Sequence, residues 1–425
     1  MVKSVLKKIA YNLSILAGVA SLVFFLFAIK PGDPIRMMGG QFVDEQTRQA
    51  MEFELGLNHS LPTRYIQYLN DLSPLSYYTD NDGVFAIKRV SIKGTKLLSI
   101  GNGNIFLKWP YLRKSYQSKQ LVTEIITETF PSTAILALSA IIFAWVVGIS
   151  IGVLAALKPN TWFDQSALFL SVLGMSGPSF FMAILMSWLF GFIWFEHIPL
   201  LIIPTAVTLF VFIFYIRKHS WKQSLKKSMV AMLISLIVLL LLYFLKQSLK
   251  WQWIDLFFVH VNLPGTGLNM TGNLIDIDPF KGEHLALKNL LLPALTLGIR
   301  PLAVVVQLTR NSMIDTLQEN YITTAKAMGL PSQIIRFKYA LKNALAPVIT
   351  ALSGWFASLL AGAVFVEFVF GWKGLGLTVF NALEKEDMPV VMGCVLFFAC
   401  IFVCINLLVD LSYRLLDPRT QITNE

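Results

Sequence analysis

Charged residues are scarce in this chain of 425 residues, because Asp, Glu, Lys and Arg together make up only 14% of it. Hydrophobic residues make up 55%, and the mean hydropathy is +0.63. Soluble globular domains carry about 25% charged residues, so this composition excludes an ordinary soluble protein. The sequence predicts an all-α polytopic membrane protein instead.

Cysteine and histidine are also rare, with three and five residues respectively. Cys394, Cys400 and Cys404 lie in the last apolar run without a CxxC pair or a neighbouring histidine. This excludes a disulfide framework elsewhere in the chain and leaves no metal-binding pattern. The histidines are scattered and no HExxH motif occurs, which argues against a membrane metalloenzyme. We predict no catalytic and no metal-binding residues.

The sequence also lacks a GxxxxGK[ST] loop, so it cannot supply the usual phosphate cradle of an ATPase. Its formal net charge of +10 does not indicate nucleic-acid binding. Lys and Arg stand mainly in short loops beside apolar runs, where they set the orientation of membrane helices. We expect contact with membrane lipid, no nucleic-acid partner, and an energy source in another protein.

The apolar runs predict about eight transmembrane helices. The first run follows Lys3, Lys7 and Lys8 and ends at Lys30 without a small-residue cleavage site, so we interpret it as an uncleaved anchor. With the basic loops inside, both termini are expected in the cytoplasm. The predicted spans are about residues 9–29, 131–157, 165–194, 199–216, 229–245, 289–308, 348–370 and 390–411.

The predicted domains follow from these spans. Residues 1–29 form the first transmembrane helix, and 30–127 form an extracytoplasmic segment. Within that segment, alternating apolar residues and several glycines predict a small β-rich insertion at about 76–108. Residues 128–425 form the main transmembrane domain, which includes an extra helical hairpin at about 198–258.

Two motifs concern the packing of the predicted helices. Gly148 and Gly152 form a GxxxG pattern, which allows a second helix to approach closely. Pro178 interrupts the third span and is expected to bend or break its helix.

The most distinctive segment is a polar, basic stretch, Asn320 to Pro347, between two apolar runs. A helix is expected from about Met313 to Met328, with Gly329 as its C-terminal cap and Pro331 in the first turn of the next helix. A positively charged cytoplasmic loop with no further role would show the same charge balance.

The individual residues of this stretch resemble the ATPase-receiving loop of bacterial ABC importer permeases, in particular the dipeptide, oligopeptide and nickel branch. That branch has Asp-Tyr-x-x-Thr-Ala-x-Ala-x-Gly, where this chain has Asn320 in place of the acid. The resemblance implies a docking loop at about 313–345. Its docking residues would be Tyr321, Thr324, Ala325, Ala327, Gly329, Asn343 and Pro347.

The same resemblance implies a six-helix permease core plus the extra hairpin, a permease domain at residues 128–425 and a multi-pass location in a bacterial inner membrane. Its implied partners are a sister permease, which we expect to be a different chain, two ATP-binding subunits and an extracytoplasmic substrate-binding protein. The chain would bind no cofactor, since ATP is used by the ATP-binding subunits. The implied cargo is short peptides, with nickel or metal chelates as the alternative.

Two charged residues in apolar runs are candidates for the pathway or its gate. Arg300 lies near the middle of its span, where a charge is costly unless it faces protein or water, so we expect it inside the helix bundle. We favour an internal ion pair, or a contact at a helix break near Pro301, over contact with substrate. Glu367 is a gate candidate or caps a re-entrant turn. An autonomous secondary transporter would need such intramembrane charges for ion coupling, and Arg300 alone is slender support for it.

Overall fold

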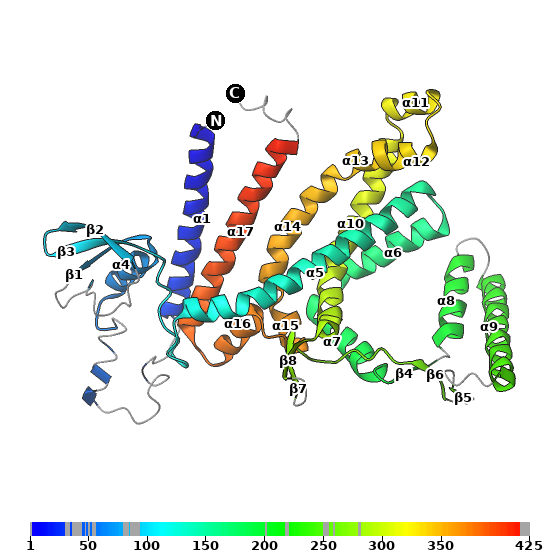
Figure 1. The fold of residues 1–425 in the computed structure, drawn as a ribbon, viewed down its shortest axis with the longest axis horizontal. Coiled ribbons are helices and arrows are strands. Elements are labelled where there is room, and N and C mark those ends of the chain that lie inside the picture. Colours follow the sequence, from blue (N-terminus) through cyan, green and yellow to red (C-terminus); the bar gives the residue numbers. More distant parts are fainter. Residues whose placement is uncertain are drawn as a thin grey trace. The chain divides into compact units, whose positions relative to one another are not determined.

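The computed structural model is mostly helical (Figure 1). It divides into two compact units. The first unit comprises Met1–Ile135, Ser353–Val364 and Lys373–Glu425, and the second comprises Leu136–Leu352 and Phe365–Trp372. The structure describes residues 2–29, 57–79, 94–199, 202–216, 221–249, 255–257, 260–278 and 282–416, with the single positions 35, 45, 46, 48, 49, 52 and 85.

In the first unit, α1 (Val2–Ile29) packs against α17 (Met388–Leu416) and α4 (Leu61–Leu72). Phe24 and Tyr68 share a buried cluster there, with ring centroids 5.3 Å apart. The start of α5 (Val122–Leu157) packs on α16 (Leu375–Glu384) and α17 through a second buried apolar cluster. Burial of these apolar faces fixes the helices of this unit.

A three-stranded antiparallel sheet lies within the predicted insertion, in the order β1 (Leu75–Thr79), β3 (Gly103–Lys108), β2 (Gly94–Ile100). The carboxylate of Asp71 in α4 accepts a hydrogen bond of 3.0 Å from the hydroxyl of Tyr78. This bond connects the sheet to the helix before it. Part of the predicted insertion, 80–93, lies outside the described residues, apart from Phe85.

In the second unit, α5 continues to Leu157 and is followed by α6 (Trp162–Ser176) and α7 (Ser179–Trp188) with η2 (Leu189–Ile193). The chain turns by 107° between α6 and α7, where Pro178 stands, so the expected bend is confirmed. The expected hairpin forms as α8 (Ile202–Ile216) and α9 (Trp221–Leu249), which lie side by side (Figure 1).

The remaining elements of this unit are the long helix α10 (Leu287–Leu317), a group of short helices after it, and short strands that the sequence did not indicate. The short helices are α11 (Asn320–Ala327), α12 (Ser332–Ile334), η3 (Ile335–Ala340) and α13 (Leu341–Ala344); α14 (Ala346–Gly362) and α15 (Val364–Phe370) follow. The strands are β4 (His197–Pro199), β5 (Asp255–Phe257), β6 (His260–Pro264), β7 (Ile275–Asp278) and β8 (Gly282–Leu285), paired as β4-β6-β5 and β7-β8.

Helices α5 and α10 approach closely through glycines, as the GxxxG pattern predicts. A Cβ atom at Gly148 would stand 2.7 Å from a methyl carbon of Val305, and one at Gly152 would stand 2.7 Å from Cβ of Thr309. From the other side, a Cβ at Gly298 would stand 2.8 Å from the carbonyl oxygen of Ala140. The two backbones can lie this close only because these positions have no side chain.

Among the described residues, four helices are long and apolar enough to cross a membrane, and up to seven spans result if each bent helix pair is one span. The protein is therefore a polytopic helical membrane protein.

Candidate functional site

The candidate site is the group of short helices between α10 and α14, shown in yellow in Figure 1. The single helix expected from Met313 to Met328 is wrong, because α10 ends at Leu317 and α11 begins at Asn320. Between them Glu319 is extended, with φ −65° and ψ 148°, and its carbonyl oxygen accepts the N–H of Ile322 at 3.0 Å.

The reason for this break lies in the core of the loop. Met313 and Ile322 are both fully buried in one cluster. At about 100° per residue, a continuous helix would place these two side chains on opposite faces. The chain has to turn between them so that both reach the same core.

Gly329 ends α11, as the sequence predicts. Its φ is +74°, and its N–H donates to the carbonyl oxygen of Lys326 at 3.0 Å. The N–H of Leu330 donates to the carbonyl oxygen of Ala325 at 3.3 Å, which completes a Schellman cap. Pro331 stands just before the next helix, as its N-cap, and not in its first turn.

The loop has a small apolar core of its own. Ala325 and Ile322 contribute from α11, and Ile335 and Ala340 from η3. The last two are five residues apart, and the wider winding of this π-helix puts both on the buried side. Nothing in the sequence indicated this π-helix. Ala325 is only 5% exposed, so its side chain supports the loop from inside and does not lie on its surface.

A hydrogen bond links the two ends of the loop. The side-chain amide of Asn343 in α13 donates to the hydroxyl of Tyr321 in α11 at 2.8 Å. Thr324 bonds within its own helix, to the carbonyl oxygen of Asn320 at 3.1 Å. Tyr321 and Asn343 were both predicted site residues, and the structure brings them together although they are 22 positions apart in the sequence.

The surface of the loop combines exposed apolar and basic side chains, and we refer to it as the outer face. Tyr321, Thr324, Ala327, Gly329, Asn343 and Pro347 are all exposed. Large apolar side chains beside them are exposed as well, which is typical of an interaction surface. These are Met328, Ile334, Phe337 and Tyr339, with Lys326, Arg336, Lys338 and Lys342 among them.

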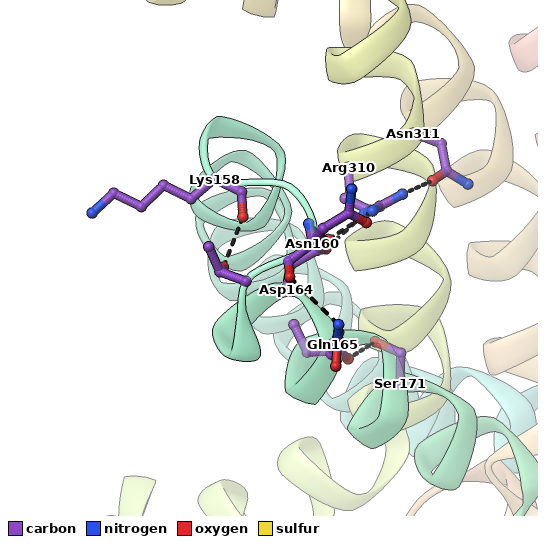
Figure 2. A network of polar contacts seen from close by, with 9 residues as sticks. Lys158, Asn160, Asp164, Gln165, Ser171, Arg310 and Asn311 are labelled. Atoms are coloured by element: carbon purple, nitrogen blue, oxygen red, sulfur yellow. Dashed lines mark hydrogen bonds and ion pairs between the residues drawn. The ribbon is translucent and has the colours of Figure 1, made fainter. Parts of the chain in front are cut away.

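An ion pair lies beneath the loop, between α6 and α10. Arg310 donates from Nε and Nη2 to the two carboxylate oxygens of Asp164, both at 2.7 Å (Figure 2). The backbone N–H of Asn160 donates to the same carboxylate at 2.8 Å. Asp164 is 1% exposed and Arg310 17% exposed. The sequence contained no signal that pairs them, since 146 positions separate the two residues.

The two pathway candidates differ in their surroundings. Arg300 is exposed in this chain, and its expected place inside the helix bundle of the transporter stays a prediction. Helix α10 also continues through Pro301, which removes the expected helix break. Glu367 is fully buried in α15, and its carbonyl oxygen accepts the N–H of Trp372 at 2.8 Å. With φ +62° at Gly371, this backbone bond belongs to a helix cap, and the gate or capping role of the Glu367 side chain stays a prediction.

Two family models match the chain. The model described as "Binding-protein-dependent transport system inner membrane component" matches residues 228–422, which include the loop, Arg300 and Glu367. The model of the N-terminal part of such membrane components matches residues 1–82.

Similar proteins match over nearly the full length. The dipeptide transport system permease protein DppB of Alkalihalophilus pseudofirmus is 27% identical over 420 residues, which cover 99% of both chains. The di/tripeptide transport system permease protein DppB of Pseudomonas aeruginosa is 29% identical over 406 residues, 95% of this chain and 94% of the relative. The dipeptide transport system permease protein DppB of Escherichia coli K12 is 28% identical over 428 residues, 99% of this chain and 98% of the relative.

Proposed function

We infer that this chain, which belongs to the family of binding-protein-dependent transport system inner membrane components, is a permease subunit of an ABC importer for short peptides. The named relatives are permeases for dipeptides and tripeptides, and their matches cover almost all of both chains. They support neither nickel or metal-chelate import nor an autonomous secondary transporter.

The outer face of the loop is the observation that carries the mechanism. It joins exposed Tyr321, Met328 and Phe337 to four basic residues, on a segment that a small core and the Tyr321–Asn343 hydrogen bond hold in shape. We propose that this face docks in a groove of a separate ATP-binding subunit. Because the loop has its own core and packs on α10, it can pass on a movement as a rigid body.

Closure of the ATP-binding subunits around ATP would then move α10 and α14 and alternate the access of the pathway. In this scheme the chain itself is non-catalytic and binds no cofactor. Tyr321, Thr324, Ala327, Gly329, Asn343 and Pro347 form or border the contact surface, and Ala325 supports it from within. The partners are two ATP-binding subunits, a different sister permease and an extracytoplasmic binding protein.

The orientation with eight crossings and both termini in the cytoplasm belongs to this proposal. Contacts within the second unit support this orientation, because they join the α5–α6 loop, which is predicted to be cytoplasmic, to the docking loop and the start of α6 to α8. Ala156, next to the α5–α6 loop, shares the buried cluster of the docking loop. Trp162 at the start of α6 stacks edge-on against Phe210 of α8, with ring centroids 4.6 Å apart. The β-rich insertion would then lie on the extracytoplasmic side of the membrane.

Exposed Arg300 acquires a different role in the same scheme. A charge in the middle of a membrane span is costly in contact with lipid. We therefore propose that Arg300 faces the water-filled pathway or the sister permease, where it can meet the carboxylate of a peptide. For Glu367 we propose a structural role, because its side chain is fully buried.

The docking hypothesis is tested by co-purification of the ATP-binding subunits with a Gly329→Arg variant. No atom lies within 4 Å of a Cβ at Gly329, so the long charged side chain would extend from the outer face without a clash, and the only strain is that of the positive φ, +74°. Gly282→Arg is a matched control, because Gly282 also has a positive φ, +68°, and open space around it, but is the first residue of β8.

We expect much less ATP-binding subunit with Gly329→Arg and an unchanged amount with Gly282→Arg. Equal amounts with both variants would contradict docking at this face. The cargo is tested by uptake of a labelled dipeptide into cells from which this chain is deleted and then restored. If the restored chain does not increase uptake, a peptide cargo is wrong, whatever the docking result.

A further inference from the structure

A large cavity lies away from the docking loop, between α6, α8 and α10. Its volume is about 1000 Å³. Most of the side chains around it are apolar, and they come from all three helices. They include Leu170 and Phe169 of α6, Leu209 and Phe210 of α8, and Ile299 and Leu302 of α10.

The helices around the cavity lie in apolar segments of the membrane domain. Helix α10 is a candidate span, α6 is part of a bent one, and 205–215 in α8 is a shorter apolar helix. Water gains little in an apolar space of this kind, whereas hydrocarbon chains fit it without loss of hydrogen bonds. At this position in a membrane, the hydrocarbon available is that of the surrounding lipids.

One end of the cavity is polar. Asn160, Thr161 and Gln165 line it there, at the loop between α5 and α6. Trp162 stands at the same end and bridges to α8 through its edge-on contact with Phe210. Tryptophan is enriched at the level of lipid headgroups, which places this end of the cavity near the membrane surface.

Two lysines stand in segments next to the polar end. Lys158 is in the same loop, two residues before Asn160. Lys227 of α9 holds its ammonium group 4.1 Å from the ring centroid of Tyr215, which directly follows the cavity residue Phe214. The neighbouring carboxylate of Asp164 is already paired with Arg310, so it offers an anion little repulsion.

We propose that this cavity binds one phospholipid with an acidic headgroup. The acyl chains lie between α6, α8 and α10, and the headgroup phosphate lies at the polar end, near Lys158 and Lys227. Basic residues beside membrane helices on the cytoplasmic side attract such headgroups. The lipid fills the space between the hairpin and the rest of the unit, so it connects α8 to the helices beneath the docking loop.

The experiment uses the complete transporter, purified in mild detergent and offered equal amounts of phosphatidylglycerol and phosphatidylcholine. Native mass spectrometry then counts the bound lipids. Leu170→Trp fills the cavity from a position that is 64% exposed in this chain. Leu138→Trp, at a 51% exposed position of α5 that does not line the cavity, is the matched control. A double variant, Lys158→Gln with Lys227→Gln, tests the headgroup end.

We expect one retained lipid with a several-fold preference for phosphatidylglycerol, lost in Leu170→Trp and kept in Leu138→Trp. The double lysine variant should keep the lipid but lose most of this preference, since one lysine near the membrane surface contributes up to about fivefold. The subunits should still co-purify in each variant, which separates lipid loss from misfolding. The proposal would be overturned if the cavity held only detergent, a peptide or a second copy of the chain. An equal preference of the unaltered protein for both lipids would overturn it as well.

Discussion

The ion pair between Asp164 and Arg310 allows a quantitative prediction. The change is Arg310→Met, which keeps much of the volume of the side chain but removes its charge. In the native protein the carboxylate of Asp164 accepts two hydrogen bonds of 2.7 Å from Arg310 and one of 2.8 Å from the backbone of Asn160. The variant leaves the carboxylate, which is 1% exposed, with only the backbone bond.

The expected cost follows from this geometry. Each hydrogen bond to a charged group contributes about 1.5–3 kcal/mol, and loss of one partner of a buried ion pair costs about 3–5 kcal/mol. Both values give a loss of at least about 3 kcal/mol in the free energy of unfolding of the second unit. For a unit of this size, that loss lowers the midpoint of thermal unfolding by roughly 6 °C or more.

The assay is thermal unfolding of the purified chain in detergent, followed by circular dichroism at a helix wavelength. The matched control is the double variant Asp164→Asn with Arg310→Met, in which no charge is left unpaired. It should be more stable than Arg310→Met alone, because an amide is less costly to bury than an unpaired carboxylate. A loss below about 1 kcal/mol for Arg310→Met, or a double variant less stable than the single one, would refute the reasoning.

Further predictions concern the loop and the packing of each unit. Tyr321→Phe removes the hydrogen bond to Asn343 while keeping the ring, so we expect about 1 kcal/mol less stability. We also expect weaker co-purification of the ATP-binding subunits. Tyr339→Phe is the control and should have neither effect. Gly152→Leu would push α5 away from α10 and cost about 1–3 kcal/mol or more, measured as a lower unfolding midpoint, and an unchanged midpoint would contradict the close approach. Asp387→Ala removes the acceptor for the Ser115 hydroxyl at 2.5 Å and for two backbone N–H groups, so limited proteolysis should cut the segment before α5 faster; an unchanged rate would count against this anchor.

Several features follow from short stretches of sequence. Gly329 is read correctly as a helix cap because a positive φ strongly favours glycine, whatever lies around it. The glycine pair at 148 and 152 likewise predicts a close helix contact, and Pro178 predicts a bend, because each effect comes from the residue's own backbone chemistry. The membrane class follows from composition alone.

Other features depend on residues that are distant in the sequence. The break before Asn320 exists because Met313 and Ile322 must reach one core, and a helix pattern read locally cannot show where that core lies. The same holds for buried Ala325, for the π-helix at Ile335–Ala340 and for the pairing of Asp164 with Arg310.

The sequence by itself determined the membrane class and the resemblance to the permease family, and it predicted a loop at about 313–345, because these depend on composition and on residues close together in the chain. The tertiary structure decided which loop residues face outward, which charges are paired and that Arg300 is exposed. These properties arise from packing between α5, α6, α10 and the short helices of the loop. Such packing brings together side chains that are far apart in the sequence, so a local pattern cannot reveal the contact.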